Sequence, residues 1–89
     1  MSIFPHTPCA SHVSFDQNNM CVDLSDGRKI FIPLVYFNRL LNATESQRNH
    51  YVISGGGTGL HWEEIDEDIR VDNLLLGIFD QTFPKSSVA

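Results

Sequence analysis

The residues best suited to chemistry in this 89-residue chain lie together between Gly55 and Ile69. A glycine-rich loop runs into His61 and the only tryptophan, Trp62, and five acidic residues follow: Glu63, Glu64, Asp66, Glu67 and Asp68. Glycine loops can bind phosphate, a histidine beside carboxylates can bind a metal ion or act as a base, and acidic clusters attract basic partners. The rest of the sequence favours the third of these chemistries.

The glycine loop lacks the residues that a phosphate site requires. A Walker loop continues with lysine and then serine or threonine, whereas Leu60 and His61 follow here. The dinucleotide fingerprint needs a long helix after its glycines, and none is predicted. We therefore expect the loop to need glycine for positive φ angles or close backbone approach. As the alternative, it forms the mouth of a small-ligand pocket: Gly55, Gly56, Gly57, Thr58 and Gly59.

Neither a metal site nor a catalytic centre is predicted. The segment Asp66-Glu-Asp68-Ile-Arg70 departs from a calcium loop, because a basic residue stands where an oxygen ligand belongs. Cys9-x-x-His12 lacks the second Cys/His pair of a zinc finger, and no serine lies on a strand-to-helix elbow. We predict no enzyme activity, no cofactor and no metal. A metal-dependent enzyme would need His61 and the acids to converge on one point.

Composition favours a single acidic domain of a cytoplasmic protein. The net charge of -5 argues against nucleic-acid binding by this chain alone and suits a basic protein partner. The two cysteines, Cys9 and Cys21, are too few for a disulfide-stabilised secreted domain and are predicted to be free thiols. No signal peptide or membrane-spanning run is recognised. Self-association into a homo-oligomer is left as an alternative.

Three segments alternate apolar and polar residues with a period of two, which is typical of half-buried strands. A two-residue loop at Asn18-Asn19 would place Phe15 opposite Val22 and Val13 opposite Leu24. The three strands form a predicted meander whose apolar residues share one face: Val13, Phe15, Met20, Val22, Leu24, Ile30 and Ile32.

The second turn of this meander has two candidate registers. A two-residue loop would place Lys29 opposite Leu24, among the core residues. A three-residue loop that ends at Gly27 places Val22 opposite Ile30 and gives Gly27 a positive φ. We predict the three-residue loop, because it keeps the core face apolar.

The second half of the chain predicts short helices and short strands. Phe37, Leu40 and Leu41 have helical spacing, and Thr44-x-x-Gln47 matches a capping box that opens a helix to about His50. Strands are expected at 51–53, 59–62 and 69–71. A final helix is predicted to begin at Asp72 and to end at Gly77.

These elements predict an α+β fold, in which a small antiparallel sheet packs with two or three short helices. The sheet is a meander of three strands plus short C-terminal strands. Residues 1–11 are expected to form a loosely ordered arm, 12–79 the single domain, and 80–89 a tail. Phe79 and Phe83 are candidates for holding part of that tail on the domain.

The chain also carries an ordered set of motifs: Leu24-Ser-Asp-Gly-Arg28, Ile32-Pro-Leu34, Phe37-x-Arg-Leu40, Thr44-x-x-Gln47-Arg48, Gly59-Leu-His-Trp62-x-x-Ile65-Asp-Glu-Asp-Ile69 and Leu74-Leu75-x-Gly77. In this order and spacing the motifs resemble the bacterial domain of unknown function 2442. The resemblance implies a compact α+β domain that is commonly found beside a small toxin-like protein. It therefore implies the antitoxin half of a toxin–antitoxin pair, and it supplies no catalytic residues.

The sequence thus predicts a non-enzymatic module that binds a basic, toxin-like protein through an acidic edge with solvated carboxylates. The predicted contacts are His61, Trp62, Glu64, Asp66, Glu67 and Asp68. Trp62 has two interpretations, because adjacent strand residues face opposite ways. It is favoured as a core residue, and the alternative is an exposed interface anchor. The alternative function is a small-ligand or regulatory module with its pocket at the glycine loop.

Overall fold

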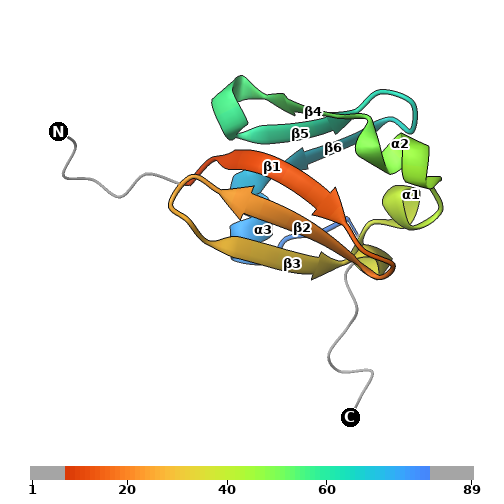
Figure 1. Cartoon of the computed structure of the whole chain (residues 1–89), viewed down its shortest axis with the longest axis horizontal. Coiled ribbons are helices and arrows are strands. Elements are labelled where there is room, and N and C mark those ends of the chain that lie inside the picture. The colour runs from red at the N-terminus through yellow and green to blue at the C-terminus, as the bar shows by residue number, and fades with distance from the viewer. Residues whose placement is uncertain (1–7, 81–89) are drawn as a thin grey trace, which may run out of the picture.

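The computed structural model describes residues 8–80 and contains two three-stranded antiparallel sheets with three short α-helices (Figure 1). The first sheet contains β1 (Ala10–Phe15), β2 (Asn19–Leu24) and β3 (Lys29–Pro33), and the second contains β4 (Tyr51–Ser54), β5 (Gly59–Trp62) and β6 (Glu67–Arg70). The helices are α1 (Asn38–Leu41), α2 (Glu45–Asn49) and α3 (Val71–Leu76), and two 3-10 turns are η1 (Leu34–Tyr36) and η2 (Gly55–Gly57). The predicted α+β class is confirmed, and the C-terminal strands form a sheet of their own.

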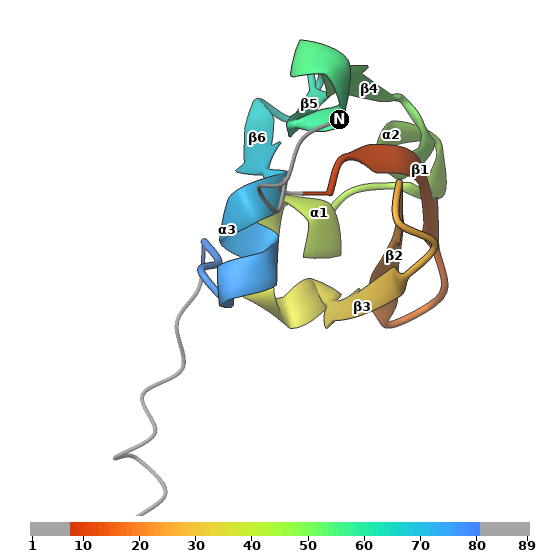
Figure 2. The ribbon, with the colours of Figure 1, turned by 90° about the vertical axis from the view of Figure 1, so that its left-hand side faces the viewer.

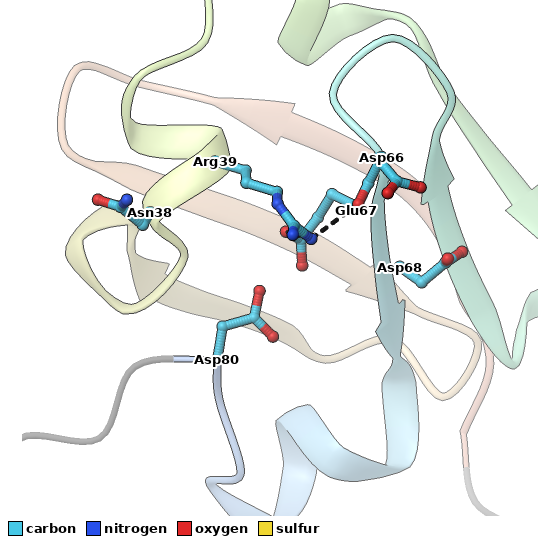
Figure 3. A pocket seen from close by; sticks show the side chains of 6 residues that line it. All are labelled: Asn38, Arg39, Asp66, Glu67, Asp68 and Asp80. Atoms are coloured by element: carbon cyan, nitrogen blue, oxygen red, sulfur yellow. Dashed lines mark hydrogen bonds and ion pairs between the residues drawn. The ribbon is translucent and has the colours of Figure 1, made fainter.

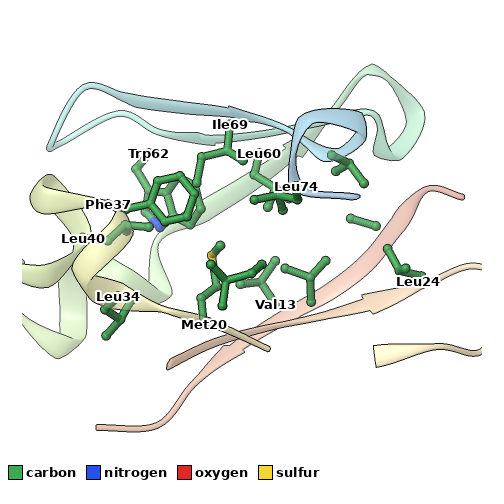
Figure 4. Packing of buried hydrophobic residues seen from close by; sticks show 14 residues of the cluster. Val13, Met20, Leu24, Leu34, Phe37, Leu40, Leu60, Trp62, Ile69 and Leu74 are labelled. Atoms are coloured by element: carbon green, nitrogen blue, oxygen red, sulfur yellow. The ribbon is translucent and has the colours of Figure 1, made fainter. Parts of the chain in front are cut away.

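The core lies between the two sheets. Figure 2 shows the first sheet on one side of this space and the second sheet with α3 round the other, and Figure 4 shows apolar side chains filling it. Its largest buried side chains are those of Trp62, Phe37 and Met20. All seven apolar residues predicted for the meander belong to this core, with Phe15 and Ile30 only partly buried. Within residues 8–80 no helix is long and apolar enough to cross a bilayer.

The β2–β3 hairpin has the predicted register. Val22 pairs with Ile30, and Gly27 has a φ of 95°. Lys29 pairs with Asp23 on the exposed side of the hairpin, where their charged groups are 3.1 Å apart. The three-residue loop is therefore confirmed, and with it the exclusion of Lys29 from the core.

The β1–β2 hairpin differs from the prediction by two residues. Val13 pairs with Val22, so the turn lies at Gln17-Asn18 and not at Asn18-Asn19. The Asp16 carboxylate explains the difference, because it accepts hydrogen bonds from the two following asparagine N–H groups at 2.8 and 2.7 Å. This Asx turn needs no positive φ at either asparagine. Because the shift is even, the same side chains still face the core.

The connection between the sheets is short and largely as predicted. Thr44 and Gln47 form a reciprocal capping box at the start of α2, with hydrogen bonds of 3.1 and 2.9 Å. Of the expected helical stripe, Leu40 and Leu41 lie in α1, and Phe37 is the extended residue between η1 and α1. Phe37 and Leu40 are buried, whereas Leu41 is exposed.

The predicted start of the last helix needs a correction. The strand β6 ends at Arg70, which is the N-cap of α3, and Asp72 lies inside the helix. There the Asp72 carboxylate accepts a 2.7 Å hydrogen bond from the Arg70 guanidinium. Gly77 ends α3 with a φ of 76°, as predicted.

The glycine turn η2 packs against the start of β1. A Cβ on Gly57 would lie 2.5 Å from the Cys9 Cβ and 2.9 Å from the Ala10 carbonyl oxygen. The first strand therefore begins at Ala10, inside the segment predicted to be a loose arm. Phe79 packs on the rings of Tyr36 and Phe37, with centroid distances of 4.6 and 5.6 Å. The other predicted tail contact, Phe83, lies outside the described residues.

Close packing at Gly57 predicts a larger stability loss there than at a glycine that needs only a positive φ. Gly27→Ala should cost about 1 kcal/mol through backbone strain, because open space surrounds its missing Cβ. Gly57→Ala should cost clearly more, because the added methyl group also meets Cys9 and Ala10. Urea unfolding of both variants measures the difference. Equal losses would contradict the contact between η2 and β1.

Candidate functional site

The β5–β6 hairpin positions the acidic cluster. Leu60 pairs with Ile69, His61 with Asp68, and Trp62 with Glu67. Alternation turns Leu60 and Ile69 into the core and His61 and Asp68 outward. The same alternation turns Trp62 and Glu67 inward.

Trp62 is a core residue. Its side chain is fully buried, its ring packs edge-on against Phe15 at 6.4 Å, and its indole N–H donates a 2.9 Å hydrogen bond to the Arg48 carbonyl. The favoured interpretation of Trp62 is thus confirmed. Its place among the predicted partner contacts is wrong, because its ring is packed in the core and does not line the cavity described below.

Glu67 is buried as well, although it was expected to be solvated. It is only 1% exposed because its position on β6 is two residues before Ile69, and both must face the same way. Its Oε1 lies 3.8 Å from the Arg39 guanidinium, too far for a hydrogen bond, and accepts none from residues 8–80. A buried carboxyl oxygen without a hydrogen bond is costly, which marks this position as unusual.

Arg39 joins α1 to the β5–β6 turn. Its Nη1 donates a 2.8 Å hydrogen bond to the carbonyl oxygen of Asp66. Asp66 has a φ of 53°, a left-handed conformation that Asp tolerates better than most residues. The turn therefore presents its carbonyl to α1, and the Asp66 side chain remains exposed.

These groups surround a cavity of about 590 Å³ (Figure 3), which we call the acidic cavity. Helix α1 contributes two of its lining residues, the β5–β6 turn and β6 contribute three, and one follows α3: Asn38, Arg39, Asp66, Glu67, Asp68 and Asp80. Four residues with carboxyl groups and one arginine thus line the cavity. Figure 3 shows Glu67 and Asp80 directed toward Arg39, and Asp66 and Asp68 directed away from it. The cavity can hold a cationic group from outside the chain.

The electrostatics of Glu67 favour its neutral form. Burial, first, and the neighbouring Asp80 carboxyl, second, raise the pKa of Glu67 to about 8, and the positive charge of Arg39 opposes them. At neutral pH the floor of the cavity therefore carries a proton.

His61 lies on the outer face of the hairpin, beside the acidic cavity. Its Nδ1 lies 2.6 Å from Asp68 and its Nε2 3.2 Å from Glu63, and these two carboxylates raise the pKa of His61 in that order. Because the two acids contact opposite ring nitrogens, His61 does not direct them to one point. Within residues 8–80, no three His, Cys, Asp or Glu side chains are arranged to hold a metal ion.

The predicted contacts therefore separate into groups. Asp66, Glu67 and Asp68 line the acidic cavity, and His61 holds Asp68 from the other face. Glu64 is exposed, forms an ion pair with His50 at 3.0 Å, and does not line the cavity.

Sequence reasoning missed three cavity residues, Asn38, Arg39 and Asp80. Arg39 was part of a quoted motif, but nothing in its spacing placed it beside residues 66–68. Asp80 was assigned to the tail. Only the alternation of β6 could have shown that Glu67 faces inward.

The glycines of the loop allow backbone conformations that other residues rarely adopt. Gly55, Gly56 and Gly57 all have positive φ angles, as expected. Thr58 lines a cavity of about 130 Å³ with three residues of β6 and α3, far smaller than the acidic cavity.

A family model described as "Protein of unknown function (DUF2442)" matches residues 10–80. A crystal structure of a protein of unknown function from Rhodospirillum rubrum has 31% identity and a TM-score of 0.73, and covers 94% of this chain and 100% of that one. A solution NMR structure of an uncharacterized protein from Chromobacterium violaceum has 21% identity and a TM-score of 0.70, and covers 83% of this chain and 70% of that one. The comparison with curated proteins gives no match.

The buried indole predicts a large loss on truncation. Trp62→Ala should lower the free energy of unfolding by about 3–5 kcal/mol, because it leaves a cavity between the sheets. Trp62→Phe is the matched control and should cost less, since it keeps one apolar ring and loses the second ring and the hydrogen bond to the Arg48 carbonyl. Urea denaturation measures both, and an unchanged midpoint for Trp62→Ala would contradict its core position.

The protonated Glu67 predicts a pH-dependent stability. Its pKa of about 8 lies above the ordinary 4.5, so folding favours the protonated form. The resulting stabilisation is complete below pH 4.5 and is lost as the pH rises to about 8. Stability of the wild type should therefore fall over this range, and Glu67→Gln should flatten the fall.

Urea unfolding across this pH range checks the prediction. His61 also has a raised pKa and contributes in the same direction, but it is present in both proteins, so their difference isolates Glu67. The control Glu64→Gln removes an exposed carboxylate and should keep the wild-type slope. Parallel curves for wild type and Glu67→Gln would refute a protonated Glu67.

Proposed function

The chain belongs to the family of proteins of unknown function DUF2442, and we propose that it is a non-enzymatic module that binds a basic partner protein at the acidic cavity. The observation that carries this proposal is the charge of the cavity lining. Four residues with carboxyl groups, Asp66, Glu67, Asp68 and Asp80, line the cavity together with the single guanidinium of Arg39. A cationic side chain of a partner would meet complementary charge there.

The net charge of the whole chain favours the same kind of partner. Its net charge of -5 attracts basic proteins at long range and repels nucleic-acid phosphates. Asp66 and Asp68 are exposed at the cavity, where they can influence the rate of association. His61 holds the Asp68 carboxylate in place by a 2.6 Å contact across the strand pair.

The resemblance suggests a small toxin-like protein as the partner. The acidic cavity is suited to a partner of this kind that is basic. In this proposal the chain is the antitoxin half of a toxin–antitoxin pair in the bacterial cytoplasm. The alternative pocket at the glycine loop is less favoured, because the cavity that Thr58 lines has only about 130 Å³.

Binding of a hexa-arginine peptide tests the module. The double variant Asp66→Asn, Asp80→Asn neutralises two cavity carboxylates, and Asn tolerates the left-handed backbone of position 66. We expect the affinity to fall roughly tenfold or more, mainly through slower association, and added salt to slow association in the wild type.

The matched control is Asp16→Asn, Asp26→Asn, which removes the same charge from two hairpin turns outside the cavity. Asn keeps an acceptor oxygen for each turn. Stopped-flow fluorescence of a labelled peptide gives the association rates. Equal weakening by both double variants, or no binding at all, would show that the acidic cavity is not the binding site.

A further inference from the structure

Glu67 lacks what a buried carboxyl group normally has. It is 1% exposed, and its Oε1 accepts no hydrogen bond from residues 8–80. Figure 3 shows the side chain directed into the acidic cavity, toward Arg39. Buried polar atoms in folded proteins almost always have partners. A buried oxygen that borders a cavity and has no partner is therefore suited to a group that enters this cavity from outside.

The charged groups around Glu67 come from every segment that lines the cavity. Arg39 of α1 lies 3.8 Å from Oε1 and also donates to the Asp66 carbonyl, which keeps it short of a hydrogen bond with Glu67. Asp80, after α3, is the carboxyl group paired with Glu67. Asp66 and Asp68 flank Glu67 in sequence, and His61 already holds Asp68. One fixed cation therefore serves several carboxylates.

We propose that the Glu67–Asp80 carboxyl pair holds one proton in the free protein and releases it to solvent when a cationic side chain of the partner enters the cavity. This inference rests on the proposed function and names the chemistry of its anchor. Before binding, the pair carries one negative charge. After binding, both groups are ionised, and their two charges face Arg39 and the incoming cation.

The exchange follows from competition for the same oxygens. A proton and a cation both stabilise the carboxyl pair, and the incoming cation lowers the pKa of Glu67 that burial and the neighbouring Asp80 carboxyl raise. A guanidinium is the best-fitting cation, because its planar donors can contact two carboxylates at once. The partner's anchor is therefore an arginine in preference to a lysine.

The proton makes binding depend on pH in a measurable way. Arginine stays charged throughout the neutral range, so any change with pH reports the protein. If one proton leaves on binding, the affinity for a hexa-arginine peptide should increase about tenfold with each unit of increasing pH, until the pH reaches the pKa of Glu67. It should become constant above that pKa.

Isothermal titration calorimetry at pH 7 in phosphate and in Tris counts the protons, because the two buffers have different ionisation enthalpies. We expect about one proton to be released from wild type and none from Glu67→Gln. His61→Gln must keep the release, since His61 titrates in the same range on the outer face. Asp80→Asn, at an exposed position, provides a second test should Glu67→Gln fail to fold. It should release fewer protons than wild type, because burial alone then raises the pKa of Glu67.

The outcomes separate this inference from the proposed function. Peptide binding without proton release, proton release that persists in Glu67→Gln, or release from Asp80→Asn equal to that of wild type would overturn the exchange and leave the binding module intact. Loss of peptide binding in every protein would overturn the module itself. In the protein without peptide, the carboxyl-carbon NMR signal of Glu67, followed against pH, measures its pKa independently. A titration of Glu67 near the ordinary value for a glutamate would refute the bound proton.

Discussion

Trp62 is the contact on which the two halves of the fold depend. Its ring packs against Phe15 of the first sheet and Tyr51 of the second, and its N–H donates to the Arg48 carbonyl of α2. One side chain thus connects both sheets and the helical segment between them. The strand pairing that turns Trp62 inward also turns its partner Glu67 inward. The acidic cavity is therefore a consequence of the same alternation that builds the core.

The chain does not relieve the cost of this buried carboxyl group internally. Arg39 lies close enough to oppose the raised pKa of Glu67 but too far to hydrogen-bond, and Asp80 increases the repulsion. Proteins usually break such local rules at functional positions, and the loss of stability is offset elsewhere. Here the burial of Trp62 and Phe37 in the core contributes the stability that offsets this loss.

Period-two alternation made most of the first sheet predictable, because only one register kept Lys29 out of the core. The first turn was misplaced because the Asp16 side chain bonds to the backbone, which a pattern of apolar residues does not reveal. The solvated interpretation of Glu67 followed its acidic neighbours and ignored its spacing from Ile69. Arg39 and Asp80 approach Glu67 only through tertiary packing, so no local pattern could place them there.

The acidic cavity takes its walls from α1, from the β5–β6 hairpin and from the residue after α3. These three segments lie apart in the sequence and meet only in the folded chain. An occupant therefore binds the native state alone and adds its free energy to global stability, about 2.7 kcal/mol at a hundred times the dissociation constant. Since proteases cut mainly the unfolded chain, occupied molecules outlast empty ones. Under the proposed function, the lifetime of the protein would then report how much partner is present.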